Sequence, residues 1–393
     1  MRENRQDKNI HNILYLNSTS MMSGAEFSLL SLMDKTDRER FDPILLLPED
    51  GSFFKQANKA GIEAIALSSL IRFGEPYRFY KLPKVVNALY KMIHIIKQKR
   101  ISLIHSNSPR VAYVGGMAAK LSSIPSIIHV RDIHLSPFSQ PLKARLLGSL
   151  SDRIIAVSSA VKDSIVSVTP SLESKINVVY NGMDIEGLDK RSIHDVRHEL
   201  GITKNTPIIG SVGLIHPVKG LDILIQSAAI IKSRIPSIKV LIIGGTLLEN
   251  ERNYKYELEC LVRDLKLEDN VIFTGFREDV FDLIGAMDVL VHPAVYPEPF
   301  PRSLLEGSAL KKPIVGTRVG GVPEILVHNE SGLLVEPGDH ASMARAILSL
   351  LENKEKAENF ALEARQRVEK FFSLKRHVGN IENMYLKLLG RSS

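Results

Sequence analysis

Residues 292–324 read HPAVYPEPFPRSLLEGSALKKPIVGTRVGGVPE, and no other part of the chain says as much about its architecture. Two glutamates, Glu298 and Glu306, lie eight residues apart across a proline-rich loop and the start of a predicted helix. A short apolar strand, 313–315, and a glycine turn, 319–322, follow directly. In parallel α/β sheets, ligands bind at the carboxyl ends of the strands, where this order places both carboxylates. The stretch therefore predicts a ligand site in a doubly wound domain.

The chemistry of this segment suits a ligand that contains both a polyol and a phosphate. A carboxylate beside a helix N-terminus accepts hydrogen bonds from hydroxyl groups, while the amides of the first helical turn bind phosphate. A sugar nucleotide contains both groups. Two glutamates at this spacing are by themselves usually solvated surface charges. The order of strand, irregular loop, helix, strand and glycine turn favours the functional interpretation.

The whole chain repeats an alternation of strand and helix patterns. At 393 residues it is long enough for two domains. Strands alternating with helices are typical of parallel sheets that are covered on both faces. The predicted fold class is therefore α/β, with a boundary within 181–195 and a helical end over 341–389. Predicted strands are 12–16, 43–47, 62–67, 103–105, 126–130, 153–157, 207–212, 239–243, 271–274, 289–291, 313–315 and 333–335.

Composition excludes several classes of protein. Cys260 is the only cysteine, which excludes a disulfide and favours a reducing cytoplasm. The polar start of the chain is not typical of a secretory signal, and no apolar run approaches the ~20 residues that span a bilayer. No set of His, Asp and Glu residues has metal-ligand spacing, so we expect neither a metal nor another cofactor. No nucleic-acid partner is expected.

Positive charge is concentrated in the first half. Residues 1–180 hold 24 Lys+Arg and 15 Asp+Glu, whereas the remainder holds 27 and 29. Residues 76–131 contain ten basic residues and no acidic one. A predicted amphipathic helix over 81–100 carries a cationic face that includes Lys91, Lys97, Lys99 and Arg100. This face is either an ordinary solvated surface or a contact with an anionic membrane.

The segment from Glu298 to Glu306 resembles the E-x7-E block of the retaining glycosyltransferases of family 4, the group 1 glycosyltransferases. TRVGGVPE (317–324) is similar to the glycine turn that the family carries after that block. The similarity covers nearly the whole chain and is strongest over 176–337. It implies the GT-B fold, in which two Rossmann-like domains face each other across a cleft. The implied domains are an acceptor-binding domain (1–185), a nucleotide-sugar-binding domain (186–372) and a C-terminal helix returning to the first domain (373–393).

The resemblance assigns roles around the donor diphosphate. Residues 208–220, IIGSVGLIHPVKG, are similar to the G-R-L-x-x-x-K-G element of the family, which places Lys219 at the diphosphate. Leu214 stands where the family usually has arginine, so one cation at the diphosphate is either missing or supplied by Arg131, Arg277 or Arg302. Gly213 and His216 belong to the same substrate-binding loop.

The same resemblance assigns roles around the sugar, the ribose and the base. Glu298 would bind hydroxyls of the transferred sugar and Glu306 those of the ribose. The amides around Phe300, Pro301 and Arg302 suit the distal phosphate, although Pro301 itself cannot donate. Arg277, in TGFRED (274–279), would lie beside the base or the diphosphate.

Three residues of the first domain complete the predicted site. Gly24 follows a strand and opens a helix, where the backbone can approach a phosphate closely. His129 stands at the end of a buried strand, and the family carries a histidine near this point, close to the transferred sugar. Arg131 lies in the loop that follows. Catalytic roles are predicted for Glu298, His129 and Lys219.

The implied reaction is transfer of a hexosyl or N-acetylhexosaminyl group from a nucleoside diphosphate sugar to an acceptor hydroxyl, with retention of configuration. The acceptor would be a saccharide or a lipid-linked saccharide in bacterial surface glycan synthesis. The protein would be cytoplasmic, with a peripheral position on the inner face of the membrane left open. A nucleotide-sugar epimerase of the same fold and a non-catalytic sugar-nucleotide-binding subunit remain as alternatives. An oxidoreductase is disfavoured because no GxGxxG motif is present.

Overall fold

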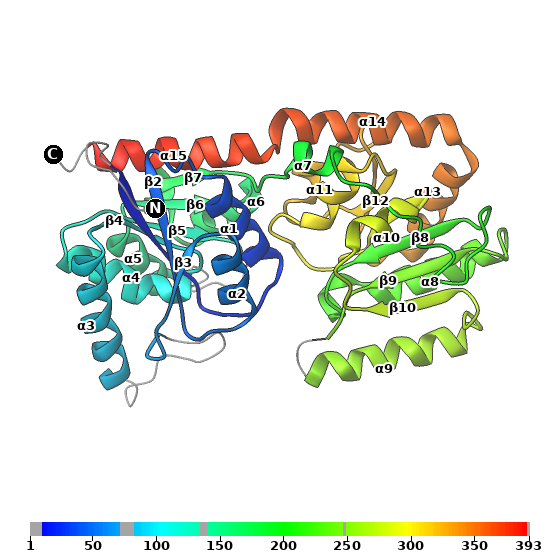
Figure 1. Ribbon diagram of the computed structural model, residues 1–393. Helices are drawn as coiled ribbons and strands as arrows, with labels where there is room; N and C mark the ends of the chain where they lie inside the picture. The colour runs from blue at the N-terminus through cyan, green and yellow to red at the C-terminus, as the bar shows by residue number, and fades with distance from the viewer. Residues whose placement is uncertain (1–9, 71–81, 134–139, 247–248, 391–393) are drawn as a thin grey trace. The chain divides into compact units, whose positions relative to one another are not determined.

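The computed structural model describes residues 10–70, 82–133, 140–246 and 249–390 (Figure 1). The chain forms two compact units. Unit 1 contains the residues up to Gly182 and those from Leu374 onward, and unit 2 runs from Met183 to Ser373. The division thus falls within three residues of the boundaries predicted at 185/186 and 372/373. Each unit is an α/β domain with a single parallel sheet.

Unit 1 is built on a seven-stranded parallel sheet in the order β3-β2-β1-β4-β5-β6-β7. Six strands correspond to the predicted ones, and the short seventh extends the edge. Their Ile, Leu and Val side chains are buried on both faces of the sheet. The strands are β1 (His11–Leu16), β2 (Phe41–Leu47), β3 (Glu63–Ala66), β4 (Ile101–Ser106), β5 (Ser126–Val130), β6 (Arg153–Ala156) and β7 (Ile176–Val178).

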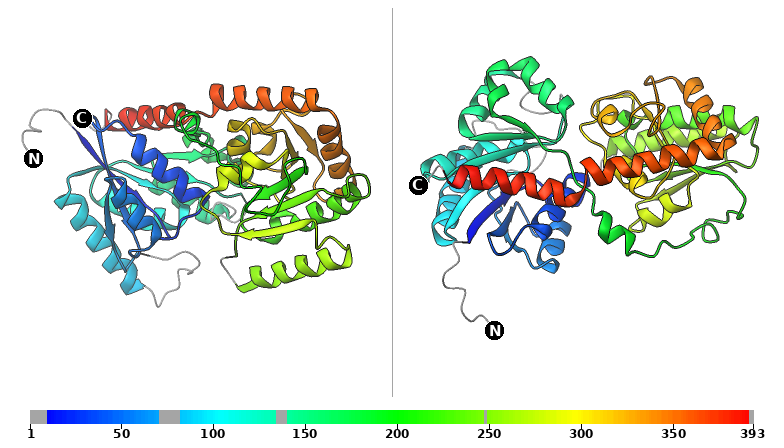
Figure 2. Two further views of the ribbon diagram at one scale, coloured as in Figure 1. Left: turned by 45° about the vertical axis from the view of Figure 1, so that its right-hand side comes forward. Right: turned by 90° about the horizontal axis from the view of Figure 1, so that it is seen from above.

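Two layers of helices cover this sheet. One apolar cluster joins β1 and β2 to α1, α2 and the C-terminal α15, and a second joins the sheet to α3 and α4. α15 packs against α1 and β4, so the predicted return of the C-terminal helix to the first domain is confirmed (Figures 1 and 2). The helices are α1 (Gly24–Lys35), α2 (Ser52–Lys59), α3 (Leu82–Gln98), α4 (Pro109–Leu121), α5 (Pro141–Leu150), α6 (Ser159–Val168), η3 (Pro170–Lys175) and α15 (Leu374–Leu389).

Unit 2 is built on a six-stranded parallel sheet in the order β10-β9-β8-β11-β12-β13. Its main apolar cluster joins the sheet to α8, α9 and α13. The strands are β8 (Ile208–Val212), β9 (Lys239–Ile243), β10 (Val271–Gly275), β11 (Val289–His292), β12 (Ile314–Thr317) and β13 (Leu333–Val335). The helices are α7 (Ile185–Asp189), η4 (Pro217–Lys219), α8 (Leu221–Lys232), α9 (Glu249–Asp264), α10 (Val280–Ala286), α11 (Arg302–Ala309), α12 (Val322–Ile325), α13 (His340–Glu352) and α14 (Lys354–Phe371).

Each sheet reverses its winding direction once. In unit 1 the reversal falls between β1 and β4, and in unit 2 it falls between β8 and β11. Loops that leave adjacent strands at such a point diverge to opposite faces, and the crevice between them is the usual ligand site of an open α/β sheet. The predicted α/β class is therefore confirmed, and the topology marks one position at the carboxyl edge of each sheet.

Candidate functional site

Lys219 is positioned by the turn that follows β8. The short helix η4 ends at this lysine, and His216 caps it, its Nδ1 accepting from the amide of Val218 at 3.3 Å. Gly220 then adopts a left-handed conformation with φ +62°. A Cβ at this position would lie 2.1 Å from the carbonyl oxygen of Pro293, so only glycine lets the two loops approach. The glycine after the lysine therefore fixes where the ammonium lies.

Glu298 is positioned by the loop between β11 and α11. Thr317 Oγ1 donates to the carbonyl of Ala294 at 2.6 Å and anchors the beginning of this loop. The amide of Gly321 donates to the carbonyl of Glu298 at 2.8 Å. Gly320 has φ +50°, and a Cβ there would meet the same carbonyl oxygen at 2.2 Å. The glycine turn noted in the sequence thus supports the backbone of Glu298, whose side chain is almost fully buried.

Lys219 and Glu298 form an ion pair beside a buried histidine. The Nζ of Lys219 lies 2.6 Å from Oε1 of Glu298, and Nε2 of His292 lies 3.5 Å from the same oxygen. Burial raises the pKa of Glu298, but the neighbouring cations and the hydrogen bond from Lys219 outweigh it, and the net pKa lies below its ordinary value. Burial lowers the pKa of His292 to about 4. Because that imidazole is neutral at pH 7, Lys219 supplies the attraction there.

The ion pair lies at the topological switch point of the second sheet. Lys219 follows β8 and Glu298 follows β11, the two strands between which the winding reverses. A cation and a carboxylate at this crevice are the groups expected to meet an anionic, hydroxyl-bearing ligand. The two residues predicted from separate motifs are therefore brought together by the fold.

Glu306 lies on α11, eight residues beyond Glu298 and four beyond Arg302. Oε1 of Glu306 accepts from Nε and Nη2 of Arg302 at 3.2 and 3.1 Å. Pro301 occupies the cap position of the helix, whose first turn presents amides that a helix does not satisfy internally. The ring of Phe300 is buried and packs edge-on against Phe372, with ring centroids 5.3 Å apart. Phe300 is therefore available to a ligand through its backbone only.

A surface poor in side chains extends from this point along β8, β9 and β10. Gly213, Gly244 and Gly275 follow or end these three strands, and the amide of Gly244 donates to the carbonyl of Gly275 at 3.0 Å. Phe276 comes next and lies beside Gly245, with 69% of its side chain exposed. An exposed aromatic ring on a bare backbone surface suits stacking with a planar group. The sequence analysis did not predict Phe276 as a site residue.

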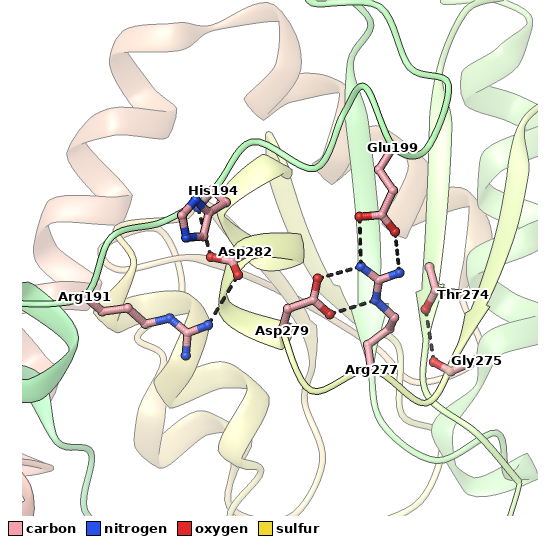
Figure 3. A network of polar contacts seen from close by, with 8 residues as sticks. All are labelled: Arg191, His194, Glu199, Thr274, Gly275, Arg277, Asp279 and Asp282. Atoms are coloured by element: carbon pink, nitrogen blue, oxygen red, sulfur yellow. Dashed lines mark hydrogen bonds and ion pairs between the residues drawn. The ribbon is translucent and has the colours of Figure 1, made fainter.

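Arg277 belongs to a separate network of ion pairs (Figure 3). Its guanidinium donates to both carboxylate oxygens of Glu199, at 2.6 and 3.2 Å. It also donates to both oxygens of Asp279, at 2.7 and 2.6 Å. Figure 3 shows the two carboxylates at different edges of the guanidinium. Two carboxylates therefore neutralise this cation, and its expected position beside the base or the diphosphate stays a prediction.

In unit 1, the helix start predicted as a phosphate site is occupied by a carboxylate. Gly24 is exposed at the first position of α1, but Ser23 Oγ donates to the buried carboxylate of Glu26. Nδ2 of Asn17 donates to Oε1 of Glu26 at 3.0 Å, and Nδ2 of Asn107 donates to Asn17 at 2.9 Å. These asparagines follow β1 and β4, the strands that flank the switch point of the first sheet. The role of Gly24 therefore stays a prediction.

Arg131 is held in place by four polar neighbours at the carboxyl edge of the first sheet. Its Nε donates to Oδ1 of Asn107 at 2.8 Å, and its Nη1 donates to Oδ1 of Asn181 at 2.7 Å. Nη1 also lies 3.2 Å from Oγ of Ser28, and Nη2 lies 3.3 Å from Nδ1 of His129. The neighbouring carboxylate of Asp132 also interacts electrostatically with this guanidinium.

His129 is enclosed by the core of unit 1. It has no exposed surface, and its Nδ1 lies 3.2 Å from Nε2 of His105. His105 in turn contacts the hydroxyl of Tyr385 at 2.5 Å, and the ring centroid of His377 is 6.3 Å from that of His129. Its Nδ1 also contacts Nη2 of Arg131, so the two residues lie together at the edge of the first sheet. The catalytic role of His129 stays a prediction.

These buried histidines predict a loss of stability in mild acid. Burial lowers the pKa of His105 to about 3 and those of His377 and His292 to about 4. Between pH 6.5 and 4 these histidines are protonated in the unfolded chain but neutral in the native chain. Their contribution to the free energy of unfolding is therefore fully present above pH 6.5 and is lost as the pH falls. At pH 5 each of these histidines lowers the free energy of unfolding by about 2 kcal/mol relative to neutral pH. We expect the melting temperature of wild type to fall steeply between pH 7 and pH 5.

Substitution separates this effect from general acid sensitivity. His377→Gln should flatten the pH dependence of the melting temperature, whereas His94→Gln, at an exposed position of α3, should leave it unchanged. Equal slopes in wild type and His377→Gln would show that His377 does not contribute to the acid sensitivity.

His292 is the second residue that sequence reasoning missed. The sequence shows this histidine at the end of an apolar strand, directly before the proline-rich loop, a pattern that more often reflects a structural role.

Among the described residues, no group of three or more His, Cys, Asp or Glu could hold a metal ion. No helix in the described ranges is long and apolar enough to cross a membrane.

The architecture of two doubly wound units is that of the GT-B fold. The chain is similar to Alr3699/HepE of Anabaena, crystallised in complex with UDP-glucose, with a TM-score of 0.82 and 27% identity. The match covers 96% of this chain and 100% of that one. A sucrose-phosphate synthase from Thermosynechococcus elongatus shares the fold with a TM-score of 0.80, at 19% identity and over 97% and 100% of the two chains.

Residues 192–367 match the model for glycosyl transferases group 1, and residues 22–186 match that for glycosyltransferase family 4. The chain belongs to the group 1 glycosyltransferases. It is 29% identical to the capsular polysaccharide biosynthesis glycosyltransferase CapM of Staphylococcus aureus over 78% of this chain and 82% of that protein. It is 22% identical to the UDP-Gal:alpha-D-GlcNAc-diphosphoundecaprenol alpha-1,3-galactosyltransferase of Escherichia coli over 96% and 97% of the two.

Proposed function

We propose that this protein transfers a hexosyl or N-acetylhexosaminyl group from a nucleoside diphosphate sugar to an acceptor hydroxyl, with retention at the anomeric carbon. The observation that carries the proposal is the Lys219–Glu298 ion pair at the switch point of the second sheet. The pair combines a cation for the diphosphate with an ionised acceptor for sugar hydroxyls. The complex of HepE with UDP-glucose supports a donor of this class.

The donor is proposed to lie along the carboxyl edge of the second sheet. Lys219 binds the diphosphate together with the amides at the start of α11, and Glu306 binds the ribose hydroxyls. The exposed ring of Phe276, above the glycine surface, stacks on the base. Glu298 receives hydroxyls of the transferred sugar. Gly213 and His216 belong to the loop that shapes the diphosphate site.

In the absence of donor, the ion pair keeps both groups satisfied. A diphosphate carries more negative charge than one carboxylate, so it attracts Lys219 away from Glu298. The carboxylate is then released to accept hydrogen bonds from the sugar. The low pKa of Glu298 keeps it ionised at neutral pH for this role. The arrangement couples diphosphate binding to capture of the sugar.

Catalysis is proposed to rest on electrostatic preorganisation. As the bond from the anomeric carbon to the diphosphate breaks, negative charge develops on the leaving oxygen, and Lys219 stabilises it in a partly buried position. Retention follows if the acceptor attacks from the face that the diphosphate leaves, with the departing phosphate taking the proton of the acceptor hydroxyl. Two carboxylates that bind different parts of one donor do not form the acid and nucleophile pair of a glycosidase.

The acceptor is proposed to be a saccharide or a lipid-linked saccharide of bacterial surface glycan synthesis. CapM is named for capsular polysaccharide biosynthesis, and the Escherichia coli relative acts on a diphosphoundecaprenol-linked sugar. Arg131, held at the carboxyl edge of the first sheet, is proposed to contact the phosphate of such an acceptor. A cytoplasmic protein with a peripheral position on the inner face of the membrane would meet this substrate.

The experiment that tests the function is incubation with a panel of UDP-, GDP- and ADP-sugars, followed by measurement of nucleoside diphosphate release with and without lipid-linked saccharides. Release that depends on one donor and rises with acceptor supports the transferase. Interconversion of donors without release would identify an epimerase. Binding of a donor without either reaction would identify a non-catalytic subunit. Leu214, in place of the usual arginine, is the reason to test for this outcome.

Replacing Glu306 by alanine should weaken binding of the donor by roughly ten- to a hundredfold, because a hydrogen bond to a charged group contributes about 1.5–3 kcal/mol. The loss should appear in the KM for the donor with little change in kcat. Wild type should prefer a ribonucleotide over its deoxy analogue, and Glu306→Ala should lose this preference. Glu330→Ala, at an exposed turn of the same unit, is the matched control. An unchanged preference for ribose in Glu306→Ala would place the ribose elsewhere.

A further inference from the structure

Three neighbouring helices on one face of the first sheet contain no acidic residue. α3, α4 and α5 lie side by side, with α4 packed against both neighbours. Together they contain 40 residues with seven Lys or Arg and no Asp or Glu. The helices across the sheet differ, since α1 contains Asp34 and α15 contains Glu382. A single-signed layer of this kind attracts anionic partners.

The outer surface of this layer also exposes large apolar side chains. On α5, Leu142 is 81% exposed and Leu146 is 50% exposed, one helical turn apart. Leu121 at the end of α4 is 66% exposed, and Tyr90 on α3 is 73% exposed. At least half of the surface of each of these side chains faces away from the unit. Exposed apolar side chains of this size indicate a surface that contacts another apolar phase rather than water.

Basic residues flank these apolar side chains on the same helices. Lys143 and Arg145 alternate with the two leucines on α5, and Lys91 and Lys97 are exposed on α3. None of these four forms an ion pair with any residue in the described ranges. Lys99, by contrast, is engaged by Glu63 at 2.5 Å and does not contribute to the surface.

We infer that the α3–α4–α5 face binds the surface of an anionic lipid bilayer, with Leu142 and Leu146 inserted among the headgroups. Exposed leucine and tyrosine flanked by lysine and arginine, without acids, is the composition of interfacial membrane contacts. A soluble protein partner would normally meet a mixture of charges. The inference goes beyond the single cationic helix over 81–100 that the sequence indicated, of which residue 81 lies outside the described ranges. It deepens the proposed use of a lipid-linked acceptor by naming the surface that meets the membrane.

Co-sedimentation of the full chain with vesicles of phosphatidylglycerol and phosphatidylcholine tests this inference. Binding should increase with the phosphatidylglycerol fraction and weaken as salt screens exposed charges. Leu142→Ser/Leu146→Ser should bind at least tenfold more weakly at all salt concentrations, because the inserted apolar area is lost. Lys143→Gln/Arg145→Gln should also bind at least tenfold more weakly at low salt, since each near-surface cation contributes about fivefold.

Two matched controls make the result specific to this face. Lys55→Gln/Lys59→Gln changes two exposed lysines of α2, across the sheet, and Leu362→Ser changes an exposed leucine of α14 in unit 2. Both should bind as wild type does. The inference is overturned if wild type stays in the supernatant at low salt, or if the controls lose binding as fully as the α5 variants. A concentration-dependent dimer that the leucine variant abolishes would also overturn it, since the surface would then join two copies.

The test is independent of the proposed reaction. The α5 variants should release nucleoside diphosphate from the donor at the wild-type rate when the acceptor is presented in detergent. Absence of vesicle binding together with normal nucleoside diphosphate release would contradict the membrane inference but not the proposed transferase function. Vesicle binding without release from any donor would contradict the transferase function but not the membrane inference.

Discussion

Replacing Lys219 by alanine is expected to lower kcat by at least a hundredfold. Removing one preorganised donor to a developing negative charge typically costs 10²- to 10³-fold in kcat. The effect should lie at the upper end here, because Leu214 occupies the position at which a second cation would reinforce the first. The substitution also leaves Glu298 buried without its principal partner, so the donor would meet an uncompensated carboxylate. Steady-state kinetics with the preferred donor measure the loss.

Two further variants show whether the effect arises at the diphosphate. Lys204→Ala removes an exposed lysine of the same unit and should leave kcat unchanged. Leu214→Arg should maintain or raise activity in the wild-type background and restore part of it in Lys219→Ala. Undiminished turnover in Lys219→Ala would show that the diphosphate binds elsewhere.

Glu298→Gln should lower kcat/KM by roughly ten- to a hundredfold, mainly through kcat. The amide keeps the volume of the side chain but loses the charged acceptor, and a hydrogen bond to a charged group contributes about 1.5–3 kcal/mol. A second consequence follows from the ion pair. Without the carboxylate, Lys219 is available to the diphosphate at once, so binding of the free nucleoside diphosphate should be unchanged or tighter.

The two outcomes for Glu298→Gln separate the sugar from the diphosphate. Slower transfer together with undiminished binding of the nucleotide alone is the expected pattern. Glu336→Gln, which alters an exposed partner of Arg318 at the end of β13, should behave as wild type. Equal loss of transfer and of nucleotide binding would mean that Glu298 supports the whole site rather than the sugar.

Strand positions could be predicted because their signal is local. Ser126–Val130 and Lys239–Ile243 match the predicted bounds, since a buried parallel strand is a continuous run of apolar residues ended by polar ones. Lys219 and Glu298 could each be proposed as site residues for a related reason, although their ion pair was not predicted. Each follows such a strand, and the motifs that contain them include the glycines that their close packing requires. The predicted boundary between the two domains rested on the polar stretch 181–195.

The remaining residues depended on contacts that the sequence does not contain. Arg277 precedes Asp279 by two residues, but its second partner, Glu199, comes from the segment before β8. His129 stands at the end of a strand like a site residue, and in the structure His105 of β4 and His377 of α15 pack against it. Phe276 gave no signal because exposure of an aromatic residue is a property of the folded surface. Long-range packing decided each of these cases.

The central claim is that a nucleoside diphosphate binds at the carboxyl edge of the second sheet through Lys219. Calorimetric titration of UDP, GDP and ADP into wild type and Lys219→Ala tests it directly, without need of the acceptor. We predict that one of the three saturates a single site per chain in wild type, and that Lys219→Ala binds it at least tenfold more weakly while Lys204→Ala binds it equally well. No saturable binding of any of the three, or equal affinity in wild type and Lys219→Ala, would contradict the claim.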